Sequence, residues 1–315
     1  MAPLDLLTVG RISIDLYCGQ LGAGWHEATT FSKAVGGSPT NVAIAAARLG
    51  RRTAVYTKVG GDPFGEVAIG ELRDFGVDVS HVGVEPELLT PLAFAVLDPP
   101  ADPKLLFRRE PPAPDLQLHP GEVADEVVTG AAIFWVSAGA LSVDPSRSTV
   151  QAMLARRDRA HPTVLDLDYR PSFWSSRAEA SATIGAAVQH ATVAVGNREE
   201  CAVAVGSEDP HEAAARLLAR GVQLAIVKLG GEGVLLADAS GEHLVAPAPI
   251  DVLCGLGAGD AFGGALCHGL LAGWTAERAV AFANAAGGIV ASRLLCSQAM
   301  PYESEVRELL EAMPA

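Results

Sequence analysis

The sequence predicts an α/β fold in which a mostly parallel sheet is sandwiched between helices, with a small lid of β-strands beside it. Short apolar runs alternate along the chain with longer amphipathic segments, a pattern typical of parallel strands joined by helices. Two mixed, strand-like segments, at about residues 12–35 and 91–109, interrupt this alternation and leave no room for a regular crossover helix. We interpret these two segments as the lid, and a pair of ordinary surface loops is an equally supported alternative.

The predicted strands of the main sheet are short runs rich in Val, Ile, Leu and Ala. They are Leu4–Val9, Thr53–Val59, Ala132–Ser137, Thr163–Asp168, Thr192–Val195 and Ala225–Leu229. The predicted helices between them are Thr40–Leu49, Gly65–Phe75, Ser146–Arg157 and His211–Arg220. No internal repeat or linker divides the chain, so we expect one domain over residues 1–315. In such sheets, ligands bind beyond the carboxyl ends of the strands.

Composition narrows the class of protein. With 49% hydrophobic and 19% charged residues, the chain has enough apolar material for a core. A net charge of −14 argues against binding to nucleic acid or to anionic membranes. No apolar run approaches the ~20 residues of a membrane span. The 5 cysteines are scattered without a Cys-x-x-Cys pair, which fits free thiols in a reducing cytoplasm.

A glycine-rich run precedes one predicted helix near the C-terminus. Phe262, Leu266 and Leu270 recur at every fourth position, so the helix begins near Ala258 and ends at about Gly273. The glycines before it therefore lie at a helix N-terminus. Free backbone N–H groups and the positive end of the helix dipole make such a terminus a favourable anion site.

Asp260 falls in the first turn of this helix, directly after Gly257, Ala258 and Gly259. A carboxylate there is suited to accept a proton from a hydroxyl that attacks a phosphoryl group. The alternative is a tight turn whose aspartate only complements the helix dipole, and this run alone does not decide between them. The motifs of P-loop, dinucleotide-binding, zinc-protease and serine-hydrolase sites are absent.

A second glycine run lies near the first predicted helix. Ser38-Pro39 suits the cap and first position of a helix, but that role does not explain Gly36-Gly37, which predicts close approach to a ligand. Asn41 in the first turn is a candidate for binding sugar hydroxyls, or else a solvent-facing polar residue. Asp15, after the first strand, is a candidate for paired hydroxyls, or else a turn residue.

Together, the Gly36-Gly37 run with Asn41 and the Gly257–Asp260 run resemble the two signature motifs of the ribokinase-like (PfkB) sugar kinase family. The resemblance covers nearly the whole chain. It implies a ribokinase-like fold, ATP and Mg²⁺ as cofactors, and Asp260 as the catalytic base. It also implies that Gly257, Ala258 and Gly259 form the anion hole of the transferred phosphoryl group.

Other residues match the family's nucleotide side, with an ordinary turn or helix residue as the alternative for each. Asn197 and Glu200 are implied to organise Mg²⁺, phosphate and water, with Glu200 acting on the metal through water. The remaining implied nucleotide contacts are Lys228, Gly230, Gly233 and, on the helix predicted over Ala276–Leu294, Asn284. The chain has Cys254-Gly255-Leu256 where the family often has Asp-Thr. This difference changes the loop that would form a monovalent-cation site.

The run from Thr163 to Pro171 is informative about the substrate. Asp166, Asp168 and Arg170 share one face of an extended strand and point together at its carboxyl end. The Asp-x-Asp-x-Arg pattern resembles the family's sugar-acid kinases, in which the arginine lies between substrate and nucleotide phosphates. Guanidinium groups bind carboxylate or phosphate in a bidentate manner. A purely structural salt bridge between Arg170 and an aspartate is the alternative.

Arg109, in the run Phe107-Arg108-Arg109-Glu110, is the other expected substrate contact. This run resembles the family's kinases of 5-dehydro-2-deoxygluconate, an acid of myo-inositol catabolism. The resemblance favours that acid, then 2-dehydro-3-deoxygluconate, then a neutral sugar such as fructose or ribose. A non-catalytic sugar-binding regulator is a further alternative, and the aromatic content of 5% disfavours a nucleoside kinase. Exposed lid strands also make a homodimer through the lid a candidate assembly.

Overall fold

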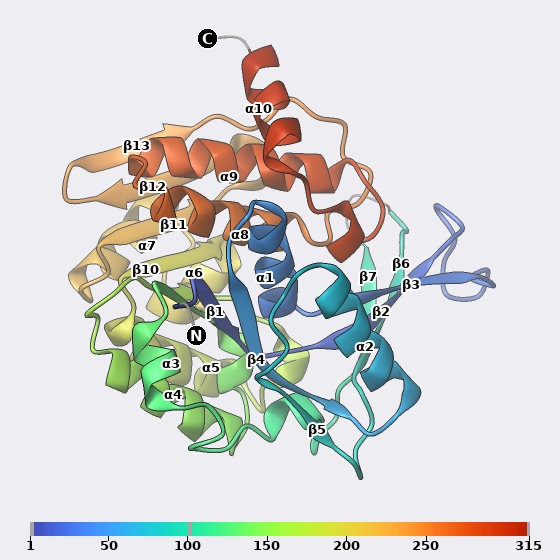
Figure 1. Cartoon of the computed structure of the whole chain (residues 1–315). Helices are drawn as coiled ribbons and strands as arrows, with labels where there is room; N and C mark the ends of the chain where they lie inside the picture. Colours follow the sequence, from blue (N-terminus) through green and yellow to red (C-terminus); the bar gives the residue numbers. More distant parts are fainter. Residues whose placement is uncertain (1–2, 100–102, 314–315) are drawn as a thin grey trace.

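The main sheet forms the centre of the protein, as shown by a computed structural model that describes residues 3–99 and 103–313. Its strand order is β13-β12-β11-β10-β9-β8-β1-β4-β5, and the strands from β11 to β5 run parallel (Figure 1). Strands β12 and β13 add an antiparallel edge. The strands are β1 Leu6–Val9, β4 Thr53–Gly60, β5 Val82–Glu85, β8 Ile133–Ser137, β9 Thr163–Asp166, β10 Val193–Asn197, β11 Leu224–Lys228, β12 Val234–Asp238 and β13 Gly241–Val245.

Helices cover both faces of this sheet because successive strand side chains point to opposite sides. Leu7 and Phe134 pack with residues of α3 to α7, whereas Leu6 and Trp135 pack with residues of α1, α8 and α9. The helices are α1 Ser38–Arg48, α2 Pro63–Asp74, α3 Asp125–Gly130, α4 Ser146–Arg157, α5 Arg177–Ala187, α6 Arg198–Val205, α7 Pro210–Ala219, α8 Ala258–Leu271, α9 Ala276–Ala291 and α10 Glu303–Ala312. The predicted sandwich is therefore confirmed.

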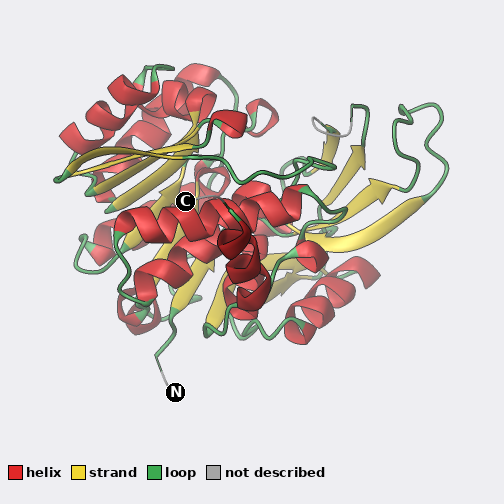
Figure 2. Cartoon of the chain, turned by 90° about the horizontal axis from the view of Figure 1, so that it is seen from above, coloured by secondary structure: helices red, strands yellow, loops and turns green. Residues whose placement is uncertain are grey.

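The lid is a separate sheet of four strands in the order β3-β2-β6-β7, and it projects to one side of the main sheet (Figure 2). Both mixed segments of the sequence contribute strands to it, so the interpretation as a strand lid is confirmed over two surface loops. Residues 100–102 of the second segment lie outside the described residues. The lid strands are β2 Ser13–Cys18, β3 Phe31–Gly36, β6 Leu92–Val96 and β7 Lys104–Arg108.

Some boundaries differ from the sequence prediction. Helix α1 is capped by Gly37 and not by Ser38, whose hydroxyl instead donates to Asp166 Oδ2 at 3.1 Å. Strand β9 ends at Asp166, two residues before the predicted Asp168. The helix predicted over Ala276–Leu294 ends at Ala291. Within the described residues, no helix has the length and apolar character needed to cross a membrane.

Close packing of α1 against α8 depends on Gly264. A Cβ added there would lie 2.4 Å from Ala45 Cβ and 2.8 Å from the Ala46 amide nitrogen. We expect Gly264→Ala to lower the free energy of unfolding by about 1–3 kcal/mol in urea denaturation, because the backbone must shift. Gly70→Ala in α2, where an added Cβ meets nothing within 4 Å, is the matched control and should raise it by about 0.5–1 kcal/mol. If Gly264→Ala and Gly70→Ala changed the free energy of unfolding equally, the packing of α1 against α8 would not depend on Gly264.

Candidate active site

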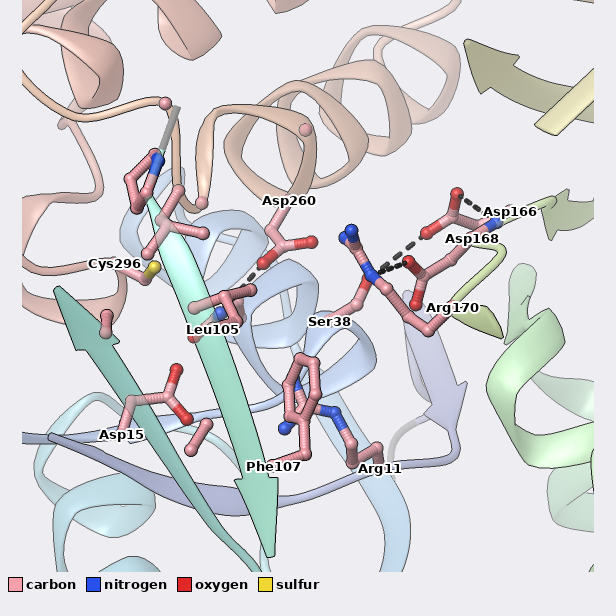
Figure 3. Close-up of a pocket in the computed structure, with 18 of the residues that line it drawn as sticks. Arg11, Asp15, Ser38, Leu105, Phe107, Asp166, Asp168, Arg170, Asp260 and Cys296 are labelled. Carbon is pink, nitrogen blue, oxygen red and sulfur yellow. Dashed lines mark hydrogen bonds and ion pairs between the residues drawn. The ribbon is translucent and has the colours of Figure 1, made fainter. Parts of the chain in front are cut away.

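Two adjoining cavities lie beyond the carboxyl ends of the strands, where the sequence placed the site. The first, here called the polar chamber, has a volume of about 310 Å³ and is lined by charged side chains of the main sheet, α8 and the lid (Figure 3). The second, the apolar groove, has a volume of about 440 Å³ and is lined mainly by glycine, proline and aliphatic residues. Lys228, Gly255 and Gly259 line both cavities, which therefore meet at the N-terminus of α8.

The N-terminus of α8 supplies free backbone donors at this meeting point. Gly257 caps the helix in the left-handed conformation, with φ 80°, and a Cβ there would lie 2.7 Å from Cys296 Sγ, so glycine is required. The amide of Ala261 makes the first bond of the helix, to the Gly257 carbonyl at 2.9 Å. The amides of residues 258–260 precede that bond and point out of the helix end.

Asp260 projects from this first turn into the polar chamber, and Asn41 Nδ2 donates to its Oδ2 at 2.8 Å. Burial raises the pKa of Asp260 from 3.8 to about 6. The hydrogen bonds from Asn41 and Ser38 act against this rise, whereas the negative charge of Asp168 adds to it. Asp260 is therefore a carboxylate at neutral pH with an unusually high affinity for a proton, as a general base requires.

This pKa predicts the pH dependence of turnover. The sequence resemblance implies that Asp260 is the base and must be ionised, so kcat/KM should rise with pH through an acidic limb near pH 6, as measured by ADP release between about pH 4.5 and pH 8. Asn41→Ala removes a hydrogen bond that lowers the pKa, so the limb of that variant should move to higher pH. A profile that stays flat below pH 5 would contradict the role of Asp260.

Charged side chains at the end of β9, in the segment that follows it and at the end of β11 form the opposite wall of the chamber. Asp166, Asp168 and Arg170 all line it, as predicted, although the strand that was expected to carry them ends at Asp166. Arg170 Nε lies 3.0 Å from Asp168 Oδ1. The arginine thus forms the salt bridge that sequence reasoning kept as an alternative, while its guanidinium still faces the chamber (Figure 3). Burial raises the pKa of Asp166 to about 8, with Lys228 opposing and the nearby carboxylates adding to the rise.

Asp168 behaves differently from Asp166. Burial would raise the pKa of Asp168, but the positive charges of Arg170, Arg11 and Lys228 outweigh burial and lower it. The same ion pair with Asp168 raises the pKa of Arg170. Asp168 and Arg170 therefore remain a charged pair at neutral pH.

Asn197 and Glu200 start α6 as a capping box. Asn197 Oδ1 accepts from the Glu200 amide at 2.9 Å, and Glu200 Oε2 accepts from the Asn197 amide at 2.7 Å. This fixes the Glu200 carboxylate in the chamber wall, 3.9 Å from Lys228 Nζ. Across residues 3–99 and 103–313, no three His, Cys, Asp or Glu side chains are arranged as a metal cage. A single fixed carboxylate fits Mg²⁺, which keeps most of its waters and binds largely through phosphate oxygens.

The apolar groove contains the other residues that the sequence assigned to a nucleotide. Gly230 and Gly233 line it, and Gly233 has φ 99° with no room for a Cβ beside the Val245 carbonyl. Asn284 donates from Nδ2 to the Ala246 carbonyl at 2.8 Å, which fixes the segment along the groove. An apolar groove that opens onto backbone amides and a lysine fits the base and the phosphates of a nucleotide.

Three of the expected substrate residues do not line the chamber. A Cβ on Gly36 would lie 2.1 Å from Asp15 Oδ2, and one on Gly37 would lie 2.2 Å from the Arg11 carbonyl. These glycines therefore make room for neighbouring protein atoms. Arg109 is buried behind the wall, with Nε 2.7 Å from Asp115 Oδ2 and its guanidinium over the ring of Phe173. Asp15 does line the chamber.

Sequence reasoning missed Arg11, Tyr17 and Cys296, which also line the chamber. Arg11 could have been predicted from the sequence, because it follows the first strand at the edge of the sheet where ligands bind. Tyr17 and Cys296 had none, since they are far apart in the chain and meet only in the fold, with 2.6 Å between Tyr17 Oη and Cys296 Sγ.

The fold, the helix-terminal glycines and the buried carboxylate define a class of phosphotransferase. Residues 4–302 match the model of the pfkB family carbohydrate kinases. The chain therefore belongs to the PfkB family, and it is a carbohydrate kinase, as the sequence resemblance predicted.

A relative agrees with this assignment, and solved structures share the fold. The 5-dehydro-2-deoxygluconokinase of Geobacillus thermodenitrificans (strain NG80-2) is 33% identical over 99% of this chain and 95% of its own length. A putative ribokinase II from E. coli, in complex with ATP and Mg²⁺, aligns with a TM-score of 0.89 at 22% identity, covering 98% of this chain and 100% of that one. A Vibrio cholerae O395 fructokinase with fructose, ADP and a calcium ion aligns with a TM-score of 0.85 at 27% identity, covering 98% and 99%.

Proposed function

We propose that the protein transfers the γ-phosphoryl group of ATP to a hydroxyl of a sugar acid, 5-dehydro-2-deoxy-D-gluconate, in myo-inositol catabolism. The observation that carries this proposal is the position of Asp260, a raised-pKa carboxylate in a chamber that also contains guanidinium groups, beside an apolar groove. Relatives at 33% identity that are named 5-dehydro-2-deoxygluconokinase support the choice of acid.

The residues of the chamber supply binding and proton transfer. Asp15 accepts hydrogen bonds from the sugar hydroxyls, and Asn41 donates hydrogen bonds to them. Asn41 also keeps the Asp260 carboxylate in place. Asp260 removes the proton of the acceptor hydroxyl as that oxygen attacks. The amides at the start of α8 stabilise negative charge on the transferred group, and Arg170 lies between the sugar and the phosphates.

The groove residues position the nucleotide. Lys228 lies where the two cavities meet, and a Cβ on Gly259 would lie 3.3 Å from its Nζ, so glycine keeps this passage open. Gly230, Gly233 and Asn284 shape the groove for the base and ribose. Glu200, oriented by Asn197, would hold Mg²⁺ through water, and the metal would supply positive charge to the phosphates. A monovalent cation at the Cys254-Gly255-Leu256 loop stays a prediction.

A substrate panel tests the proposed function. Purified protein with ATP and Mg²⁺ is offered 5-dehydro-2-deoxygluconate, 2-dehydro-3-deoxygluconate, fructose and ribose, and ADP release is measured. We expect the highest kcat/KM with the first acid. A preference for fructose or ribose would contradict the acid assignment, and tight binding of an acid without ADP formation would indicate a regulator.

We also propose a cytoplasmic homodimer formed through the lid. Strands β3 and β7 are the lid's edges, and Phe31 and Leu106 on them are 39% and 42% exposed. The cysteines are free and buried, which fits a reducing compartment. Analytical ultracentrifugation of the wild type and of Leu106→Arg checks the assembly, with a dimer expected for the first and a shift toward monomer for the second.

A further inference from the structure

Among the described residues, Arg11 is the cation of the polar chamber that forms no salt bridge with a carboxylate. Three cationic side chains line the chamber: Arg11, Arg170 and Lys228. Arg170 lies 3.0 Å from Asp168, and Lys228 lies 3.9 Å from Glu200. In the part of the chain that the structure describes, no carboxylate oxygen lies within 4.0 Å of an Arg11 nitrogen. Arg11 acts on Asp15 and Asp168 through space and without a salt bridge, so its N–H donors are the ones most available to an anionic ligand.

The backbone of Arg11 is fixed independently of its side chain. Arg11 lies in the connection between β1 and β2, where the main sheet passes into the lid. Thr40 Oγ1 donates to the Arg11 carbonyl at 3.2 Å, and Gly10, with φ 137°, turns the chain just before it. Because these contacts involve backbone atoms of Arg11, a changed side chain leaves the connection in place.

The Arg11 side chain is fixed from two sides inside the chamber. Its Nη1 donates to Ser13 Oγ at 2.7 Å, and Ser13 Oγ donates to Asp15 Oδ1 at 2.7 Å. The guanidinium carbon lies 5.2 Å from the ring centroid of Phe107, a residue of the lid strand β7 (Figure 3). The Phe107 ring in turn packs on Phe173, with 5.1 Å between centroids. The guanidinium is thus preoriented beside Asp15, the carboxylate that we propose binds the sugar hydroxyls.

We infer that Arg11 binds the carboxylate of the sugar acid, that Phe107 positions its guanidinium, and that this pair sets the preference for acids over neutral sugars. The inference rests on the proposed function. A guanidinium has five N–H donors, and Ser13 uses one of them, so enough remain for bidentate binding of a carboxylate. In this arrangement Arg11 binds the acid group, whereas Arg170, paired with Asp168, binds near the transferred phosphoryl group.

The test compares the acid with its neutral C1 amide in four proteins. In the wild type, kcat/KM should favour 5-dehydro-2-deoxygluconate over the amide. Arg11→Gln should lower kcat/KM for the acid by about 10²-fold and change that for the amide by less than about 3-fold, which removes the preference. Phe107→Leu should raise KM for the acid by about 5-fold with kcat kept. Arg108→Gln, an exposed lid arginine paired with Glu110, is the matched control and should match the wild type.

The outcomes separate this inference from the proposed function. A wild type that prefers the acid, together with an Arg11→Gln variant that keeps the preference, overturns the role of Arg11 and leaves the proposed function intact. A wild type that prefers the amide or a neutral sugar overturns both. Arg11→Lys keeps the charge but lacks the planar guanidinium, so it should retain part of the preference for the acid. It replaces Arg11→Gln in the test if Arg11→Gln has a lowered melting temperature.

Discussion

Asp260→Asn is expected to lower kcat by about 10³-fold while the fold and substrate binding remain. The asparagine is close in size and keeps an oxygen that accepts from Asn41 Nδ2, so the hydrogen bond seen at 2.8 Å can persist. What is lost is the carboxylate that we propose removes the hydroxyl proton. Turnover is measured by ADP release, and binding of the acid by calorimetry, so that a catalytic loss is separated from a loss of affinity.

The same variant has a stability readout whose sign follows from the raised pKa. The folded protein raises the pKa of Asp260 from 3.8 to about 6, so the stability that its proton contributes is present at low pH and lost as pH rises through 6. The change in melting temperature caused by Asp260→Asn should therefore be more positive at about pH 7.5 than at about pH 4. Asp74→Asn, at an exposed carboxylate at the end of α2, is the control and should change neither turnover nor stability. Turnover close to wild type in Asp260→Asn would contradict the assignment of the base.

Arg170→Gln is expected to lower kcat/KM by about 10²-fold or more, because it removes the charged donor that we propose lies between the sugar and the phosphates. It should also move the acidic limb of the pH profile upward, since the positive charge of Arg170 lowers the pKa of Asp260. Asp168→Asn, which removes a negative charge that raises this pKa, should move the limb downward. Opposite displacements distinguish an electrostatic role at the base from simple loss of folding, and limbs at the same pH in both variants would argue against it.

Most of the fold was predictable because its determinants are local. The apolar runs of the parallel strands, the recurrence of Phe262, Leu266 and Leu270, and the glycines before Asp260 are each visible in a few consecutive residues. The antiparallel hairpin β12–β13 was not predicted. Its outer strand is largely exposed and has a mixed sequence, Gly241–Val245, so its pattern does not stand out from a loop.

The site was less predictable where distant residues decide the geometry. Arg109 and Arg11 are both arginines near the lid, and only the fold shows that Asp115 neutralises the first and leaves the second in the chamber. Gly36-Gly37 was expected to admit a ligand, whereas a Cβ at either position would collide with Asp15 or with the Arg11 backbone. The identity of a glycine shows that space is needed but not which atom fills it.

The central claim is that Asp260, where the two cavities meet, deprotonates a hydroxyl of a sugar acid. A crystal structure with 5-dehydro-2-deoxygluconate and a non-hydrolysable ATP analogue tests it most directly. We predict an acceptor hydroxyl within about 3.2 Å of the Asp260 carboxylate, with the γ-phosphoryl group at the amides that start α8. An acid bound with every hydroxyl beyond reach of Asp260, or an analogue bound outside the apolar groove, would contradict the claim.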